Sequence, residues 1–200
     1  ARAAGLSPQA LADELLALRR EDFWDPGFGA GLLRGALFRE RLARILPVAH
    51  IDDCAIPLAV SVLQWAGRQT RVIDRGELVP AVYASCAVPL LFQPIRVDGK
   101  LASDGGIADR WGLAGVRDGE RVFYHHLGSR SPWRRAGDPG LQVPQRANLA
   151  ALELHGIPRS GPSKLALGRE IFRRARHGTG EALASPVGTQ TDSFRTVCPL

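Results

Sequence analysis

Apolar residues recur at helical spacing near the start of the chain. Through QALADELLALRR a stripe of leucines would share one helix face: Leu11, Leu15, Leu16 and Leu18. Ser7-Pro8 is a typical helix start, because serine caps the first turn and proline fits the first helical position. The segment DFWDPGFGAG indicates a loop, and a second amphipathic helix is expected from about Arg34 to Leu46, where Pro47 ends it.

The middle of the chain predicts extended segments around one short helix. Ile56–Trp65 is apolar and β-branched enough for a buried strand, and RQTRVIDRG continues as a second extended piece. ELVPAVYASCAV indicates a helix of small residues, since Pro80 fits its first turn. IRVDGKLAS predicts a hairpin about Asp98-Gly99 that delivers Asp104 at the end of a strand.

The rest of the chain predicts two strands, a helix and a tail. RVFYHHLGS is extended, and ANLAALELHGIP is assigned as a strand over a helix because Pro158 and Gly161 close it. SKLALGREIFRRARHG predicts a helix with four inward residues: Leu165, Leu167, Ile171 and Phe172. Alternating strands and helices favour one α/β layered domain over residues 1–184, followed by a flexible tail at residues 185–200.

Composition narrows the class of protein. The chain has 200 residues with 45% hydrophobic and 23% charged residues, which fits a globular domain. It has no apolar run of about 18 residues and no signal-peptide pattern, so no membrane span is expected. Its three cysteines are scattered without metal-type spacing and imply no disulfide framework, which predicts a reducing, cytoplasmic setting. No metal and no cofactor are expected.

The net charge of +6 comes almost entirely from arginine. Two groups of arginines stand out, at residues 130–135 and 169–176, and solvated faces are favoured over a specific anion-binding surface. Nucleic acid is not expected as a partner, because these arginines are not interleaved with exposed aromatic residues.

Two Asp-Gly turns follow each other in VDGKLASDGGIADR. Asp98-Gly99 is an ordinary hairpin turn, whereas Asp104-Gly105-Gly106 leaves the backbone bare beside a carboxylate. Such a stretch suits either a strained turn or close approach by another group. Taken locally, a turn-capping role is the favoured explanation of Asp104.

The motifs around this turn resemble, in the same order, those of patatin-like phospholipase domains. They are ASCAVP (residues 84–89), FQP (residues 92–94), the first Asp-Gly turn and then Asp-Gly-Gly. AAGLSPQALADELLALRREDFWDP resembles the helix after the family's nucleophile, and IPRSGPSKLALGREIF resembles a late segment of bacterial members, so the resemblance covers Ala3 to Arg176. It implies a three-layer sandwich with a mainly parallel central sheet.

The resemblance also implies lipid acyl hydrolysis by a Ser-Asp dyad. The serine would sit in a G-x-S-x-G elbow, Asp104 would take its proton, and an upstream glycine-rich loop would supply the oxyanion hole. A serine needs a base within hydrogen-bond reach, and Gly105 and Gly106 would let the serine loop approach the carboxylate. The expected substrate is a lipid or another ester.

The chain departs from this pattern because it contains no G-x-S-x-G. GLSPQ has Gln9 in place of the second glycine, and Ser7 is better explained as a helix cap. We therefore expect an N-terminally truncated domain whose nucleophile precedes Ala1 and which is inactive alone. The alternative is a non-catalytic binding or regulatory module that kept the fold.

Other candidate residues carry weaker hypotheses. His125 and His126 would point to opposite faces of a strand, so no metal site is expected. Ser85 and Cys86 favour helix packing, and a solvated role for Asp109 is favoured over a hydrogen bond to the Asp-Gly-Gly loop. Three aromatic residues in Gly/Pro loops would either contact a membrane surface peripherally or cover the core: Trp24, Phe28 and Trp133.

Overall fold

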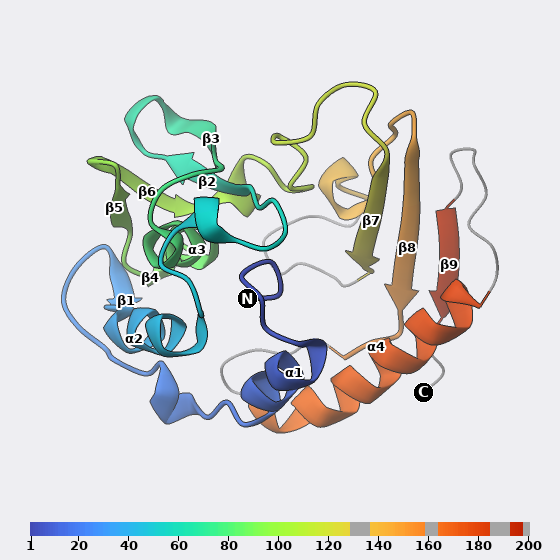
Figure 1. The fold of residues 1–200 in the computed structure, drawn as a ribbon, viewed down its shortest axis with the longest axis horizontal. Coiled ribbons are helices and arrows are strands. Elements are labelled where there is room, and N and C mark those ends of the chain that lie inside the picture. The colour runs from blue at the N-terminus through green and yellow to red at the C-terminus, as the bar shows by residue number, and fades with distance from the viewer. Residues whose placement is uncertain (129–136, 159–163, 185–192, 198–200) are drawn as a thin grey trace. The chain divides into compact units, whose positions relative to one another are not determined.

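The computed structural model describes residues 1–128, 137–158, 164–184 and 193–197. The chain divides into two compact units, Ala1–Gly115 and Val116–Leu200, which are described separately below. The expected domain over residues 1–184 spans this division. Both units combine helices with strands, so the α/β class is confirmed (Figure 1).

The first unit contains three α-helices and six strands among its described residues. The helices are α1 (Pro8–Leu16), α2 (Ala36–Ile45) and α3 (Leu78–Cys86). The strands are β1 (Gly31–Leu33), β2 (Val60–Gln64), β3 (Gln69–Ile73), β4 (Leu90–Phe92), β5 (Ile95–Val97) and β6 (Lys100–Asp104). Every helix, strand and hairpin expected from the sequence in this unit is present, with shorter bounds.

The starts of α1 and α2 are fixed by side-chain caps. Ser7 Oγ accepts a hydrogen bond from the Ala10 N–H at 3.1 Å, as the sequence predicts. The cap of α2 comes from Asp25, in the preceding loop, whose carboxylate accepts bonds from the amides of residues 35, 36 and 37. Asp25 satisfies the unpaired amides of the first turn although it lies about ten residues before them. The sequence therefore has no Ser, Thr, Asp or Asn directly before the helix that would predict its start.

The main sheet of the first unit is antiparallel throughout, with the strand order β3-β2-β6-β5. A mainly parallel sheet was expected, and this sheet differs because short turns join β2 to β3 and β5 to β6, which forces neighbours to run in opposite directions. The parallel pairing in this unit lies between β1 and β4. In the main sheet Val62 of β2 stands opposite Asp104 of β6.

The core of the first unit forms where α3 packs on β2, β5 and β6. Tyr83 of α3 is fully buried and donates a hydrogen bond to the Gln93 carbonyl at 2.8 Å. Its ring contacts Phe38 and Phe92 at centroid distances of 5.8 and 6.1 Å. Aromatic edge contacts of this kind, together with a satisfied hydroxyl, anchor the helix that ends beside the Asp-Gly-Gly turn.

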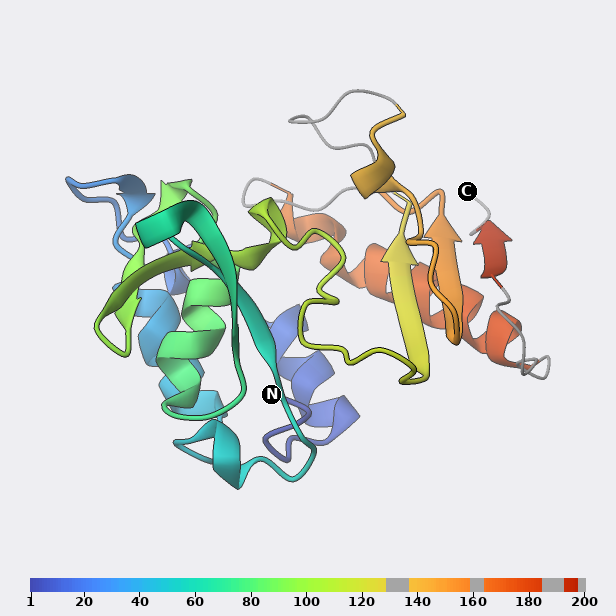
Figure 2. The ribbon, with the colours of Figure 1, turned by 90° about the horizontal axis from the view of Figure 1, so that it is seen from above.

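The second unit is a parallel sheet with one helix packed against it (Figure 2). Strands β7 (Val122–Leu127), β8 (Leu149–His155) and β9 (Ser193–Val197) pair in that order, and α4 (Gly168–Leu183) follows β8. The segment expected as a tail therefore contains a strand, and the remainder of residues 185–200 lies outside the described residues.

The buried face of α4 differs from the one predicted. Ala175 and Ala182 pack against Leu152 and Leu154 of β8, whereas Phe172 is 38% exposed. Leu167, 37% exposed, precedes the helix, which begins at Gly168. The prediction that both residues point inward is wrong, because it extended one helical phase across a 3₁₀ turn at Leu165–Leu167.

Candidate active site

Asp104 is the last residue of β6 and caps the 3₁₀ turn Gly105–Ile107. Its backbone N–H donates to the Ala87 carbonyl at 3.0 Å, which ties the strand end to the end of α3. Its Oδ1 accepts a hydrogen bond from the Gly106 N–H at 2.7 Å. Within the described residues Oδ2 has no hydrogen-bond or ion-pair partner, so one side of a half-buried carboxylate remains open to accept a proton.

The surroundings make Asp104 a stronger base than an ordinary aspartate. Burial raises the pKa of its carboxyl above the ordinary value of 3.8, while the Gly106 N–H and the Arg110 guanidinium pull the pKa the other way. A carboxylate with a raised pKa accepts a proton more readily, which is the property required of a general base.

The two glycines after Asp104 serve different contacts. A Cβ on Gly105 would lie 2.2 Å from the Ser61 carbonyl oxygen, so the backbone of β2 occupies that space. A Cβ on Gly106 would lie 3.0 Å from Asp104 Oδ1. The backbone of β2 therefore leaves no room for a side chain at Gly105, and the Asp104 carboxylate lies close to the Cβ position of Gly106. That both glycines admit a serine loop stays a prediction.

Asp109 is bound into the same turn and is not solvated, so the favoured prediction for it is wrong. Its carboxylate accepts the Ser61 hydroxyl at 2.5 Å and the amides of Leu113 and Ala114 at 3.1 Å each. Its own N–H donates to the Gly105 carbonyl at 2.8 Å. Local sequence could suggest an aspartate that caps the following amides, but the Ser61 partner lies 48 residues away and gives no local signal.

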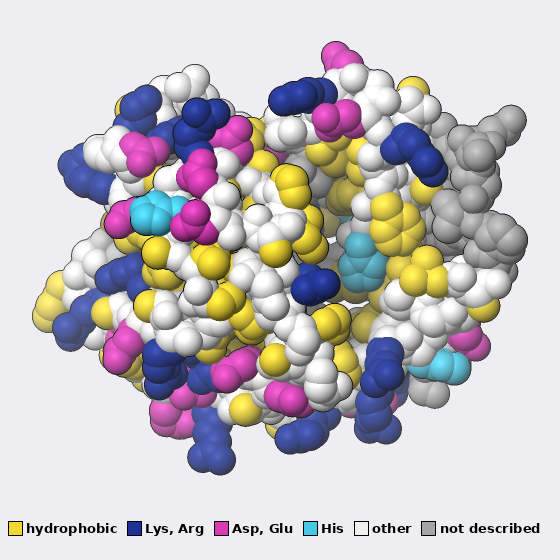
Figure 3. All heavy atoms as spheres, viewed as in Figure 1, with side chains coloured by type: hydrophobic (Ala, Val, Ile, Leu, Met, Phe, Trp, Pro, Cys, Tyr) yellow, Lys and Arg dark blue, Asp and Glu magenta, His cyan; other side chains and the backbone are white. Residues whose placement is uncertain are grey.

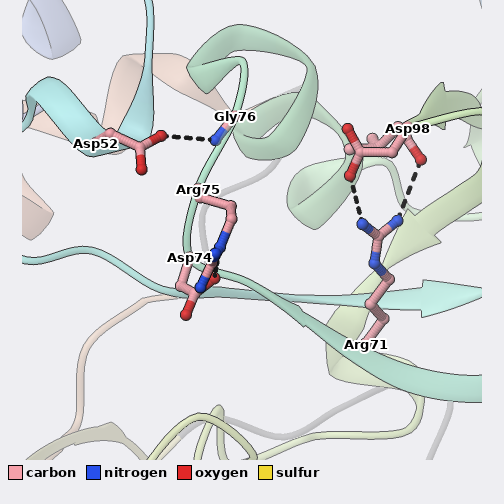
Figure 4. Close-up of polar contacts among 7 residues, drawn as sticks. Asp52, Arg71, Asp74, Arg75, Gly76 and Asp98 are labelled. Atoms are coloured by element: carbon pink, nitrogen blue, oxygen red, sulfur yellow. Dashed lines mark hydrogen bonds and ion pairs between the residues drawn. The ribbon is translucent and has the colours of Figure 1, made fainter.

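The hairpin that leads into Asp104 is fastened at its turn by Arg71 of β3. Its guanidinium donates to the Val97 carbonyl at 3.2 Å and forms an ion pair with Asp98 (Figure 4). The neighbouring Asp52 accepts the Gly76 N–H at 2.9 Å, and this bond is the main cause that holds the pKa of Asp52 below its ordinary value. Because the Asp98 side chain is largely exposed, the Arg71 pair fixes the turn geometry more than it adds stability.

Cys86, at the end of α3, is electrostatically coupled to Asp104. Cys86 is exposed. The protein around its thiol nevertheless raises the pKa of that thiol by burial, and the negative charge of Asp104 raises the pKa further. Ser85 precedes it in the helix and is half-buried. The sequence predicted that both residues allow close packing of the helix. The reactivity of the Cys86 thiol can in addition report on the charge of Asp104.

Replacing Asp104 by Asn is expected to speed alkylation of Cys86. Removing the negative charge lowers the thiol pKa, so that at about pH 8 the rate with iodoacetamide should rise about threefold. Peptide mass spectrometry of residues 1–200 measures the rate at each cysteine, and Cys54 serves as the control that should not change. An unchanged Cys86 rate would contradict the proximity of the two groups.

The other candidate residues that the structure describes have contacts within their own units. His126 Nε2 lies 3.1 Å from the Leu141 carbonyl oxygen, His125 is exposed, and the described residues hold no cluster of three or more metal-ligand side chains. Phe28 is fully exposed, and Trp24 lies under the Arg20 guanidinium at 3.8 Å, while Trp133 falls outside the described residues.

Two further features bear on possible partners: the lengths of the helices and the distribution of charged side chains. No helix among the described residues is long and apolar enough to cross a bilayer. On the face that Figure 3 draws, basic and acidic side chains are interspersed over the strands of the first unit.

The first unit is a mixed α/β unit with a half-buried carboxylate on an Asp-Gly-Gly turn. A sequence model of the patatin-like phospholipase family matches residues 1–113, nearly the whole first unit, and the chain belongs to this family. The match ends before the late segment near Arg176 that also resembled bacterial members.

Curated relatives agree with this family. Uncharacterized NTE family proteins of Mycobacterium bovis and Mycobacterium tuberculosis are 31% identical to the chain over 93 residues. The alignment covers 46% of this chain and 26% of each relative, so the matched part spans about a quarter of their length.

Proposed function

We propose that residues 1–200 supply the base of a Ser-Asp dyad in a lipid acyl hydrolase, and that Asp104 is this base. The observation that carries the proposal is the half-buried carboxylate with one oxygen held by Gly106 and the other without a partner in the described residues. The raised pKa of Asp104 and the family assignment support the same role. The chain contains no G-x-S-x-G, so the proposal requires a serine outside residues 1–200.

The proposed chemistry uses one carboxylate for both halves of the reaction. The serine hydroxyl transfers its proton to Asp104 while Oγ attacks the ester carbonyl carbon, and the departing alcohol takes that proton when the ester C–O bond breaks. A water molecule then gives a proton to Asp104 and attacks the acyl-serine. The acid is released when the bond from Oγ to the acyl carbon breaks, and the serine recovers the proton.

The substrate class follows the family, whose members act on lipids and other esters. Peripheral membrane contact through the exposed Phe28 is part of the proposal, because an aromatic side chain at a loop tip can enter a lipid surface. The three-layer arrangement and the cytoplasmic location stay predictions from the sequence.

Labelling with a fluorophosphonate, which reacts with activated serines, tests the proposal. In the natural polypeptide that contains residues 1–200, we expect one labelled serine, located by peptide mass spectrometry in a G-x-S-x-G segment. Residues 1–200 produced alone should remain unlabelled. A natural polypeptide without any reactive serine would favour the alternative, a binding or regulatory module with the same fold, which the missing motif also fits.

A further inference from the structure

Asp109 holds the two ends of the segment that follows the candidate base. Its carboxylate binds forward to the amides of Leu113 and Ala114, each at 3.1 Å. Its N–H binds backward to the carbonyl of Gly105, the residue directly after Asp104, at 2.8 Å. One residue therefore ties the start of the segment after Asp104 to the end of that segment at Leu113 and Ala114.

Ser61 attaches this segment to the centre of the sheet. Its hydroxyl donates to Asp109 Oδ2 at 2.5 Å, and both side chains are partly buried. Its carbonyl oxygen occupies the space where Gly105 would carry a Cβ. Ser61 pairs with Val72 of β3, and the next residue, Val62, pairs with both Arg71 of β3 and Asp104 of β6, so Ser61 lies beside the central pairing of the sheet.

We propose that Ser61 and Asp109 are positioning residues that fix the direction of the Asp104 carboxylate. The proposal rests on the base role of Asp104 and adds how the chain aims that base. Aim matters because a base must lie within hydrogen-bond reach of the hydroxyl it deprotonates, and small displacements of a catalytic group cost large factors in rate.

A Ser-Asp pair could instead be a dyad of its own. The hydrogen bonds of Asp109 favour the positioning role, since Oδ1 accepts from Leu113 and Oδ2 accepts from both Ala114 and Ser61. Every oxygen of that carboxylate already has a donor, whereas Asp104 keeps Oδ2 without a partner in the described residues. The two aspartates therefore differ in what their oxygens can still accept.

The first test is amide hydrogen exchange in residues 1–200, followed by NMR. Ser61→Ala removes the hydroxyl without changing charge, and we expect the Gly106 and Asp109 amides to exchange about tenfold faster. Ser61→Thr keeps the hydroxyl on a strand-favouring residue and should restore slow exchange. Ser103→Ala is the matched control, since Ser103 lies beside Asp104 but accepts its bond from Trp65 at 3.0 Å.

The second test is ester turnover by the natural polypeptide that supplies the serine. Ser61→Ala and Asp109→Asn should each lower kcat about tenfold with KM unchanged within about twofold, because positioning affects the reaction step and not substrate binding. Unchanged exchange and kcat in Ser61→Ala, a changed KM alone, or a Ser61→Thr variant as impaired as Ser61→Ala would overturn the proposal. Fluorophosphonate labelling of Ser61 would overturn it as well.

The two tests separate this inference from the proposed function. Exchange at Gly106 needs no turnover, so the positioning role can fail while Asp104 remains the base. Turnover that survives Asp104→Asn would remove the base role and the positioning proposal that rests on it, even where the exchange results hold.

Discussion

The Asp104→Asn variant of the natural polypeptide should lose p-nitrophenyl ester hydrolysis by a factor of about 10² to 10⁴, the usual contribution of a general base. A carboxamide has almost the shape of the carboxylate but cannot take the serine proton. Its Oδ1 can still accept the Gly106 N–H, so the turn should persist. Steady-state kinetics measure the loss, which should fall on kcat.

Asp98→Asn is the matched control for this variant. Asp98 begins the other Asp-Gly turn of the same hairpin, and its carboxylate binds Arg71 at an exposed position. Losing that ion pair should cost at most about 1 kcal/mol of stability and leave turnover intact. Turnover retained in Asp104→Asn, or lost equally in both variants, would contradict the assignment of Asp104 as the base.

The pH dependence of the stability of Asp104→Asn tests the raised pKa of the Asp104 carboxyl independently of turnover. Because the folded-state pKa of Asp104 is raised, the folded protein binds this proton more tightly than the unfolded chain, and ionisation costs stability as pH rises through the folded pKa. At about pH 7 the variant should therefore unfold at a temperature no lower than the wild type. The advantage should disappear below the ordinary value of 3.8, where both chains are neutral at this position.

Short-range patterns in the sequence located the elements and placed Asp104 at a strand end, whereas its role as a base was implied by the family resemblance. The Ser7 cap, the hairpin about Asp98-Gly99 and the position of Asp104 at a strand end all depend on residues within a few positions of each other. Such features are encoded by turn chemistry and alternation, which act locally.

The features that escaped prediction depend on contacts between distant segments. The Asp25 cap on α2 joins residues 10 positions apart, the Ser61 partner of Asp109 lies 48 positions away, and the pairing of β2 with β6 joins Val62 to Asp104. The contact of Gly105 with β2 was not predicted for the same reason, since Ser61, whose carbonyl oxygen would meet a Cβ at Gly105, lies far upstream in the sequence. Glycine signals close approach, but not which segment approaches.

Replacing Gly105 by Ala is expected to produce the largest loss of stability, about 3 kcal/mol, because overpacking against a fixed backbone is poorly relieved. The added methyl would lie 2.2 Å from the Ser61 carbonyl oxygen and 2.5 Å from its carbon. Ser61 cannot move away freely, since it pairs with Val72 of β3 and the adjacent Val62 pairs with β3 and β6. Urea unfolding followed by tryptophan fluorescence measures the change, as Trp24, Trp65 and Trp111 all lie in the first unit.

Substitutions at two other glycines are the controls for the loss of stability in Gly105→Ala. In Gly106→Ala the methyl would meet Asp104 Oδ1 at 3.0 Å, a side-chain atom that can turn aside, so the cost should be only about 1 kcal/mol. Gly168, the first residue of α4, has no atom within 4 Å of its Cβ position, and Ala there should be neutral or stabilise by about 0.5 kcal/mol. Equal stabilities of Gly105→Ala and Gly106→Ala would mean that β2 does not fill the space beside Gly105, and the anchoring of the turn through Ser61 would then lose its structural basis.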